Sequence, residues 1–426
     1  MNKNFIFVFI LASILSISPI AMAQPFSNED ILKELRILKA RVEKLENELR
    51  ERDAVINQIN TEQPWTTKTE IIIEEMDEDE NEWEDRISIS GLVELEYGND
   101  SHNIKDPVAG FSEVRADSSD FTLATLELGI DAGINEYVKA HVLLLYEEDD
   151  TEDFSVDEGT IILGGTESTH GLHLMGGKYY PRFGELHSSF ISDPLTLELF
   201  EINESAFQAG FDNEWISLNT GVFHGDVENR FSSESKMNSF FADINLHPAE
   251  EVLSGLTMLI GLSYMNNVSD SDTLQEEVQD LNSDGVTNDL MRRVDGIAAY
   301  LVAEYGGIGL SAEYITALKR FKAGEMGYAI DRNGTMLESE PGAWNFELTY
   351  RLREDWLVGA KYEGSADMFG LFPEKQYGIV TGWSGLPYLT LSAEYLHGEY
   401  DENNRNADGL IEDDRDLITV QVAMEF

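Results

Sequence analysis

The chain has 426 residues, no cysteine and a formal net charge of −52. A surface this acidic repels nucleic acid and favours cations nearby, which excludes DNA or RNA as a partner. Without cysteine, no disulfide framework supports the protein. The fold must therefore be stabilised by backbone pairing and by burial of apolar surface.

The first 23 residues have the pattern of a secretory signal peptide. Lys3 precedes an apolar stretch over residues 5–17, and small residues around Ala23 form an A-x-A cleavage motif. The apolar stretch is too short for a comfortable membrane span. We expect export with removal of residues 1–23, and no lipid anchor, because no cysteine follows the cleavage site.

Residues 24–63 are predicted to form a periplasmic helical coiled coil. Apolar residues recur at alternating spacings of four and three over roughly four heptads. They are Ile31, Leu35, Leu38, Val42, Leu45, Leu49, Ile56 and Ile59. This seam favours self-association into a homo-oligomer, and the alternative is one helix packed on another part of the same chain. Residues 64–85 follow as an acidic linker that cannot build a core.

Residues 86–426 alternate between apolar and polar side chains with a period of two. In WNFELTYR, Trp344 and Phe346 share one face while Asn345 and Glu347 share the other. Sixteen such segments occur, each about the length that crosses a bilayer at a tilt. Thirteen centre near residues 126, 142, 161, 175, 208, 219, 242, 261, 301, 313, 360, 380 and 392, and the others are RISISGLVELEY, WNFELTYR and LITVQVAMEF. The expected fold class is all-β, a transmembrane antiparallel barrel of about 16 strands.

The connections between these segments alternate between short and long. Short ones include residues 132–136, 306–307, 352–355 and 384–387, and long ones include 98–120, 181–203, 267–294, 319–341 and 398–415. An outer-membrane barrel has short periplasmic turns and long external loops, whereas a soluble sandwich has no reason to alternate in this way. An apolar last strand ending in Phe426 also suits lipid. The pattern predicts a cell outer-membrane location, with lipid as the partner of the barrel.

A barrel of this size encloses a water-filled lumen rather than a side-chain core. If the apolar faces contact lipid, the opposite faces line the lumen with Glu94, Glu96, Glu127, Glu304, Glu313, Glu347, Arg351, Lys361, Glu363 and Glu394. This wall is acidic on balance, and its field can select cations. The alternative is an ordinary solvated face, and conductance measurements separate the two interpretations.

The connection 181–203 contains too many apolar residues for an exposed loop, among them Phe183, Phe190 and Leu199. Folding into the barrel would bury them and narrow the pore. Its polar residues would then line a constriction made of Arg182, Glu185, His187, Asp193, Glu198 and Glu201. The alternative is a loop that packs on a neighbouring subunit.

Another long connection contains DLNSDGVTND, which follows the first half of a calcium-binding loop. Oxygen-bearing side chains recur at every second position around a glycine turn, at Asp280, Asn282, Asp284 and Asn288. The twelfth position is Met291 instead of a bidentate glutamate, so we expect only weak Ca²⁺ binding in this external loop. The alternative is a polar loop with Asp-Gly turn chemistry. No cofactor is otherwise required.

Catalytic motifs are missing from the sequence. The eight histidines are scattered, and neither a Gly-x-Ser-x-Gly elbow nor a His-Glu-x-x-His pair occurs. His170 and His173 lie three residues apart in a strand context, which does not suit a zinc pair. We therefore do not expect an enzyme.

Six segments carry a family likeness that extends over nearly the whole chain. They are RISISGLVELEY, LATLELGIDAGINEYVKAHVLLLYEED, VDEGTIILGGTE, GGKYYPRFGE, ISDPLTLELFEINESA and LITVQVAMEF. Together they resemble the LbtU-type siderophore porins of Gram-negative bacteria, especially those of Legionella. The resemblance implies outer-membrane uptake of a ferric siderophore without the TonB-coupled plug. It supplies no ligand residues.

Sequence length agrees with transport that does not depend on TonB. A plugged transporter of that class has about 22 strands, and the segments before this barrel are predicted to be a helix and a linker. Uptake of a ferric siderophore is the leading expectation. One alternative is a general cation-preferring porin, which the acidic lumen favours. Another is a structural barrel that tethers the outer membrane to the cell wall through its coiled coil.

Overall fold

The computed structural model describes residues 86–105, 114–148, 154–229, 237–248, 253, 255–279, 289–331, 333–401 and 411–426. The predicted signal peptide, coiled coil and linker lie outside the described residues, as do the predicted calcium ligands Asp280, Asn282, Asp284 and Asn288. The described part contains no helix with the length and hydropathy of a membrane span.

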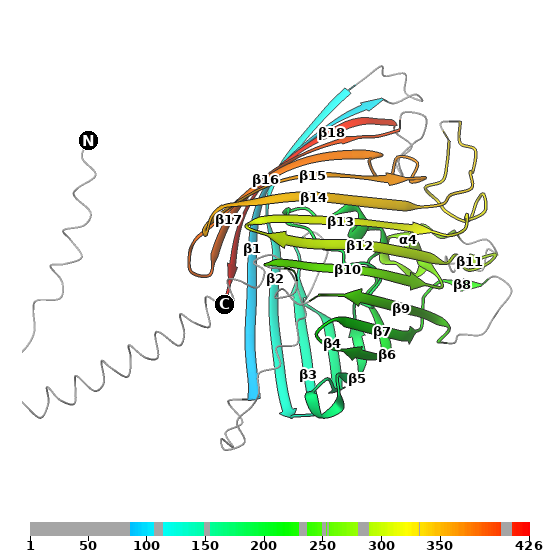
Figure 1. Cartoon of the computed structure of the whole chain (residues 1–426). Helices are drawn as coiled ribbons and strands as arrows, with labels where there is room; N and C mark the ends of the chain where they lie inside the picture. Colours follow the sequence, from blue (N-terminus) through cyan, green and yellow to red (C-terminus); the bar gives the residue numbers. More distant parts are fainter. Residues whose placement is uncertain are drawn as a thin grey trace, which may run out of the picture. The chain divides into compact units, whose positions relative to one another are not determined.

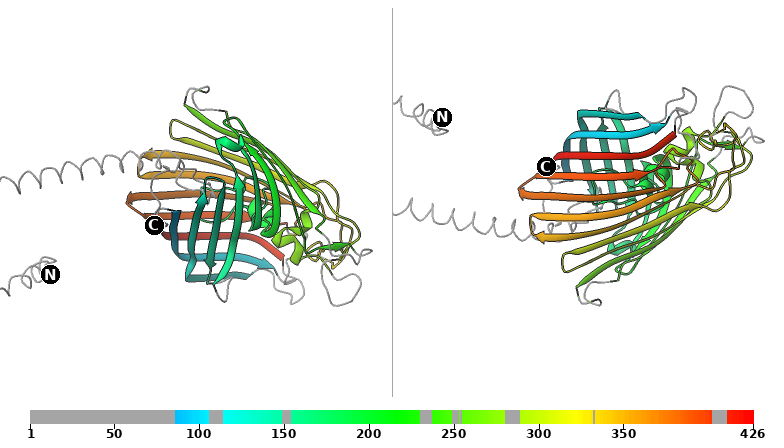
Figure 2. Two further views of the ribbon diagram at one scale, coloured as in Figure 1. Left: turned by 90° about the horizontal axis from the view of Figure 1, so that it is seen from below. Right: turned by 90° about the horizontal axis from the view of Figure 1, so that it is seen from above.

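The described chain forms a closed antiparallel β-barrel of 16 strands (Figure 1), and Figure 2 shows the same ring of strands from two further directions. The barrel strands are β1 (Ile87–Lys105), β2 (Val114–Asn135), β3 (Val138–Tyr146), β4 (Ser155–Gly164), β5 (Leu172–Tyr179), β6 (Glu204–Asp212), β7 (Ile216–Phe223), β9 (Ser239–Leu246), β10 (Leu256–Met265), β12 (Gly296–Tyr305), β13 (Ile308–Ala317), β14 (Gly342–Arg353), β15 (Trp356–Ala366), β16 (Lys375–Leu386), β17 (Leu389–Glu399) and β18 (Ile411–Glu425). Strands adjacent in this order pair with each other, and β18 closes the ring on β1. The fold class is confirmed, because each predicted strand lies in one of these elements.

Alternation along the strands separates two faces, as the period of two requires. Outward side chains are large, apolar and exposed, such as Ile89 at 64% and Ile379 at 61%. Inward side chains are polar, and Glu347 and Glu363 are only 1% and 0% exposed. The exposed apolar band fits lipid, and the buried carboxylates show that something inside the barrel covers part of its inner wall.

Two of the predicted long connections are shorter than expected. β1 has 19 residues, β2 has 22 and β18 has 15, so these strands continue into the segments 98–120 and 398–415 that were predicted to be loops. The extension is polar, and its backbone pairing is supported by side-chain contacts. Arg415 donates two hydrogen bonds to Asp100, at 3.1 and 2.7 Å, and Ser101 donates one to Asp117 at 2.5 Å. The apolar alternation ends near Tyr97, which is why the sequence pattern missed this extension.

A hydrophobic core lies where several long connections meet. L3 (residues 180–203, between β5 and β6) contains α2 (Leu195–Phe200), and L5 (residues 266–295) contains η3 (Val268–Asp270) and α4 (Asp272–Glu276). L6 (residues 318–341) also contributes side chains to this core. The core includes Phe183, Leu199, Phe200, Val268, Leu274, Val278, Phe321 and Met326, all buried.

A two-stranded sheet and a 3-10 turn complete the secondary structure of the described residues. β8 (Glu228–Asn229) and β11 (Asp289–Leu290) pair in parallel, outside the barrel sheet. Figure 1 shows them at the same end of the barrel as α4. The short 3-10 turn η2 (Glu167–Thr169) connects β4 to β5.

Candidate functional site: a loop fastened across the lumen

L3 runs along the inner wall of the barrel. Its backbone and serine side chains donate hydrogen bonds to inward-facing residues of β10, β13, β14, β15 and β17. These acceptors are on the face opposite the lipid-exposed side chains, so L3 lies inside the barrel. The residues from Gly184 to Leu195 cross successive strands and contact one wall glutamate after another.

The first fastening point is Glu313 on β13. Its carboxylate accepts hydrogen bonds from the backbone N–H of Glu185 at 2.7 Å and of Leu186 at 3.3 and 3.2 Å. Gly184 has a φ of +104°, and a Cβ there would lie 2.6 Å from Oε1 of Glu313. Only glycine tolerates both this backbone angle and this approach, so Gly184 fixes how L3 enters the lumen.

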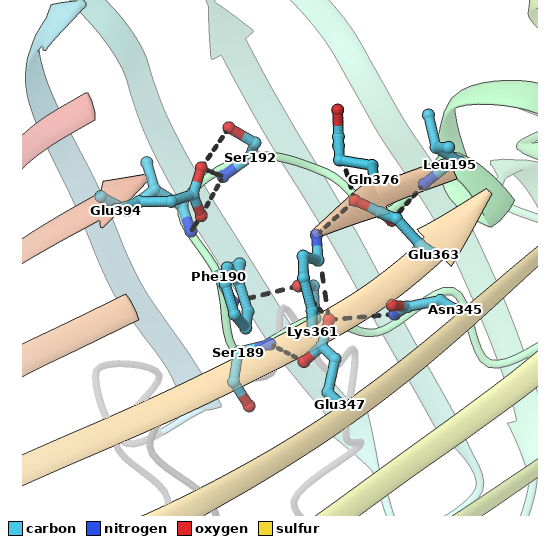
Figure 3. A network of polar contacts seen from close by, with 12 residues as sticks. Ser189, Phe190, Ser192, Leu195, Asn345, Glu347, Lys361, Glu363, Gln376 and Glu394 are labelled. Carbon is cyan, nitrogen blue, oxygen red and sulfur yellow. Dashed lines mark hydrogen bonds and ion pairs between the residues drawn. The ribbon is translucent and has the colours of Figure 1, made fainter. Parts of the chain in front are cut away.

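Glu347 on β14 and Glu394 on β17 are the next fastening points (Figure 3). Glu347 accepts hydrogen bonds from the Ser188 hydroxyl at 2.6 Å and from the Ser189 N–H at 2.8 Å. Glu394 accepts from the Ile191 N–H at 2.8 Å and from the Ser192 hydroxyl at 2.6 Å. The Ser192 N–H also donates to Glu394, at 3.4 and 3.3 Å. Each carboxylate therefore binds backbone amide and serine hydroxyl donors, in charge-assisted hydrogen bonds that are stronger than neutral ones.

Lys361 on β15 places one positive charge within this buried acidic wall. Its Nζ lies 3.1 Å from Oε1 of Glu363 and 4.0 Å from Oε1 of Glu347, and all three side chains are 0–1% exposed. Glu363 also accepts hydrogen bonds from the Leu195 N–H at 2.9 Å and from Gln376 at 2.7 Å. The ion pairs and hydrogen bonds together satisfy carboxylates that would otherwise be costly to bury.

Phe190 anchors the middle of L3 through packing. The Nζ of Lys361 lies 4.7 Å from the centroid of its ring, which is a cation–π contact. The ring packs on Val380 and Leu396 in a small apolar cluster. A Cβ at Gly378 would lie 2.8 Å from the Phe190 ring, so this glycine makes room for it.

The charged side chains of L3 behave differently from its anchors, because several face water. Arg182, Asp193 and Glu198 are exposed, whereas Glu185, His187 and Glu201 are half-buried. The surrounding barrel wall partly desolvates these side chains even where they are exposed to the lumen. This desolvation, followed by repulsion from Asp193, raises the pKa of Glu198 to about 7 and that of Glu201 to about 8. L3 thus presents carboxylates whose charge changes near neutral pH.

Arg182 is the basic member of the predicted constriction. Desolvation lowers the pKa of its guanidinium, but the carboxylates of Glu185 and Asp243 outweigh this and raise it. Asp243 also accepts hydrogen bonds from Tyr300 at 2.6 Å and from Ser263 at 2.9 Å. Arg182 therefore remains charged beside a polar patch of the β9–β12 wall.

The wall formed by β1 and β2 also presents glutamates inward. Glu94, Glu96 and Glu127 are half-buried, and Glu96 accepts a hydrogen bond from Gln421 at 2.8 Å. Asp193 of L3 interacts electrostatically and unfavourably with both Glu94 and Glu96. Carboxylates from L3 and from this wall therefore share one region of the lumen.

All ten residues predicted to line the lumen wall lie on inward faces, but the structure divides them. Glu313, Glu347, Glu363 and Glu394, with Lys361, are buried beneath L3, while Glu94, Glu96, Glu127, Glu304 and Arg351 are not. Arg351 lies 3.9 Å from Glu304. The role of each residue in conduction stays a prediction.

Several site residues were missed from the sequence. Ser192, Asn345 and Gln376 complete the network in Figure 3, and Ser188 adds a hydrogen bond to Glu347. Tyr180 and Asn203 bind Asp157 at the two ends of L3, at 2.9 and 2.8 Å. The serines in HSSFISD were a usable signal, because an apolar loop has little need for them unless they donate hydrogen bonds to the barrel wall.

Within the described residues, no group of three or more His, Cys, Asp or Glu side chains could hold a metal ion.

Comparison with known proteins gives distant sequence relatives. No family profile matches the chain. It is 21% identical over 295 residues to a UPF0422 protein of Legionella pneumophila (strain Lens), covering 65% of this chain and 54% of that protein. It is 23% identical over 274 residues to a UPF0422 protein of Coxiella burnetii (strain RSA 493 / Nine Mile phase I), covering 62% and 56%. The chain thus spans about half the length of the curated relatives it matches.

Solved structures share the fold at low identity. The outer membrane channel DcaP of Acinetobacter baumannii aligns with a TM-score of 0.51 and 13% identity, over 80% of this chain and 97% of that one. OprB of Pseudomonas putida aligns with a TM-score of 0.52 and 10% identity, over 80% and 95%. OmpF of Salmonella typhi gives 0.50 and 10%, over 80% and 97%. By fold, the chain is a porin-like antiparallel β-barrel.

Proposed function

We propose that this protein is a passive outer-membrane pore for small solutes, in which L3 sets the constriction and no TonB-coupled plug takes part. The observation that carries the proposal is the fastening of L3 to Glu313, Glu347, Glu363 and Glu394 across the inner wall. We propose that a loop fixed in this way narrows the lumen and leaves a passage open. Arg182, Glu185, His187, Asp193, Glu198 and Glu201 would then contact the solute.

A preference for cations follows from the charges that remain open to water. Asp193 and Glu198 are exposed on L3, and Glu94, Glu96 and Glu127 lie on the wall of β1 and β2. Carboxylates that share a water-filled passage with low-dielectric walls raise the local concentration of cations and lower that of anions. This supports a cation-preferring pore on electrostatic grounds alone.

A ferric siderophore is the specific cargo that the family resemblance suggests. The Legionella and Coxiella relatives are compatible with that resemblance, and their names assign no cargo. A neutral or cationic ferric complex suits the acidic passage. An anionic ferric complex would need Arg182, which is exposed on L3 beside Asp243 and Tyr300.

The alternative function as a tether between the outer membrane and the cell wall depends on residues 24–63, which lie outside the described residues.

Single-channel recording of the refolded mature protein in planar bilayers tests the proposal. Saturating current block by a ferric siderophore, absent with the iron-free siderophore, supports siderophore uptake. Open, cation-selective current without block supports a general cation-preferring porin and ends the siderophore assignment. Absence of any current contradicts the pore itself and favours the tether, which deletion of residues 24–63 followed by an envelope-attachment assay then tests.

A further inference from the structure

The lumen face of β3 carries two leucines beside two polar residues. Lys139 and His141 face inward in the first half of this strand, and Leu143 and Leu145 continue the same face because strand side chains alternate. Leu145 is paired with the inward Glu127 of β2. Both leucines are half-buried, so part of their apolar surface is open to the lumen.

Elsewhere, large apolar residues that face inward are fully covered by the core to which L3, L5 and L6 contribute. On β7, β9, β10 and β13 they are 0% exposed, and they are Phe223, Phe241, Met265 and Ile315. Leu143 and Leu145 belong to neither of the two apolar clusters that the described residues form. Apolar surface left in contact with water is unfavourable, and inside a concave passage it is typical of a ligand-binding surface.

A glycine keeps the side of Leu143 accessible. Gly129 of β2 is paired with Leu143. A Cβ at this glycine would lie 2.5 Å from Oγ of Ser90 and 3.9 Å from Cδ1 of Leu143. Any larger side chain at position 129 would therefore occupy the space beside the leucine, and glycine leaves that space to a solute.

Carboxylates surround the leucine pair on β2 and β4, the two strands beside β3 (Figure 1). Glu127 is half-buried, and among the described residues it has no hydrogen-bond or ion-pair partner. Its strongest electrostatic neighbours are all acidic, and they are Glu94, Glu147, Asp157 and Glu158. This part of the wall therefore attracts positive charge.

A bulge in β4 brings two of these carboxylates close to the leucines. Leu143 is paired with Glu158 and Leu144 with Val156, so Asp157 is the extra residue between them. The nearest basic side chain on the inward face of β3 is His141, and its Nδ1 already lies 2.7 Å from Oδ1 of Asp131. The leucines thus have acidic neighbours toward L3.

L3 presents further acids to the same passage. Asp193 interacts electrostatically with Glu94 and Glu96, and Glu201 with Asp157. A solute that passes between L3 and this wall therefore meets negative charge on both sides and an apolar patch on one. The combination suits a cation that is partly apolar, because a simple hydrated ion gains nothing from the leucines.

We propose that Leu143, Leu145 and Glu127 form a binding site for an organic cation that carries an apolar group. The positive group would pair with Glu127, and the apolar group would cover the two leucines. This inference rests on the proposed pore function and deepens it. The field of the carboxylates prefers cations in general, whereas the leucines select the amphiphilic ones among them.

Current block by two cations of equal charge tests the site. Benzyltrimethylammonium carries an apolar ring that tetramethylammonium lacks. Covering the leucines with this ring should lower the half-blocking concentration roughly tenfold in the wild type. Equal half-blocking concentrations for the two cations would overturn the proposal and leave the pore function standing.

A pair of variants separates the leucines from the size of the blocking ion. Leu143→Ser/Leu145→Ser should reduce the preference for the benzyl compound to about twofold, with block by tetramethylammonium unchanged. Leu144→Ser is the matched control and should keep the full preference, because Leu144 lies between the two leucines and faces outward. Open-channel current shows that each variant has folded. A full preference in the double variant would contradict the proposal.

Cysteine protection tests binding without relying on conduction. The chain has no cysteine, so His141→Cys places a single thiol on the inward face, two residues before Leu143. Its modification by an uncharged, water-soluble thiol reagent should be slowed by benzyltrimethylammonium and not by tetramethylammonium at the same concentration. The same rate with both cations would overturn the proposal. Selective protection in a barrel that conducts no current would support the site and contradict only the pore.

Discussion

The inward glutamates on two sides of the lumen have different environments, although they look alike in the sequence. On β13 to β17, Glu313, Glu347, Glu363 and Glu394 are buried and accept hydrogen bonds from L3. On β1 and β2, Glu94, Glu96 and Glu127 are only half-buried. The difference lies in what covers each carboxylate, because a covered one needs donors and an uncovered one acts through its field.

Among the variants considered, loss of Lys361 should have the largest effect on how L3 is held against the covered glutamates. Lys361→Met leaves Glu347 and Glu363 buried without their cation, and removing one partner of a buried pair costs roughly 3–5 kcal/mol. We expect L3 to detach, with larger and noisier single-channel currents and a lower unfolding temperature in detergent. Lys361→Met/Glu363→Met should recover part of the stability, and its failure to do so would mean that packing rather than charge fixes L3.

Removal of one carboxylate that binds L3 should cause the next largest loss of stability. Glu394→Ala leaves the Ile191 N–H and the Ser192 hydroxyl without their acceptor, at a cost of about 1–3 kcal/mol. The expected readout is a lower midpoint in chemical denaturation. Glu127→Ala is the control and should leave the midpoint unchanged. Equal losses for both variants would erase the distinction between covered and uncovered glutamates.

Neutralising the water-facing acids should change selectivity without changing stability. At pH 9, where Glu198 and Glu201 are charged, each charge lost in Asp193→Asn/Glu198→Gln/Glu201→Gln acts on a passing ion about 10 Å away with roughly 0.15 kcal/mol after screening in 0.1 M salt. The cation-to-anion permeability ratio should fall roughly fivefold, as measured from reversal potentials. The change should shrink in 1 M salt, and a change that persists there would point to a steric cause.

Acidification should also lower the cation preference of the pore, by a smaller factor. The pKa values of Glu198 and Glu201 are raised to about 7 and about 8, so both carboxyls are mostly protonated at pH 6 and charged at pH 9. Cation preference should therefore fall roughly threefold as the pH decreases from 9 to 6. Glu198→Gln/Glu201→Gln should flatten the profile, and an unaltered slope would assign the titration to other groups.

Much of the fold was predictable from the sequence because barrel strands follow local rules. Alternation of apolar and polar residues located each strand, and it placed Glu347, Lys361 and Glu363 correctly on inward faces. The polar extensions of β1, β2 and β18 were missed because they have no apolar face to mark them.

The site was only partly predictable, for a physical reason. The apolar residues of L3 correctly indicated that the loop needs burial, but the sequence carries no signal for which wall it contacts. The pairing of Ser188 with Glu347 and of Ser192 with Glu394 spans 159 and 202 positions in the chain. Such contacts depend on closure of the barrel, so the split between covered and uncovered glutamates became visible only in the structure.

The most direct test of this account is a paired single-channel measurement on Glu347→Ala/Glu394→Ala and Glu94→Ala/Glu96→Ala, each compared with the wild type in the same bilayers. We expect the first variant to raise conductance and current noise with little change in cation preference, because L3 is released. The second should lower cation preference and keep the quiet current of the wild type. The same response from both variants would contradict the account.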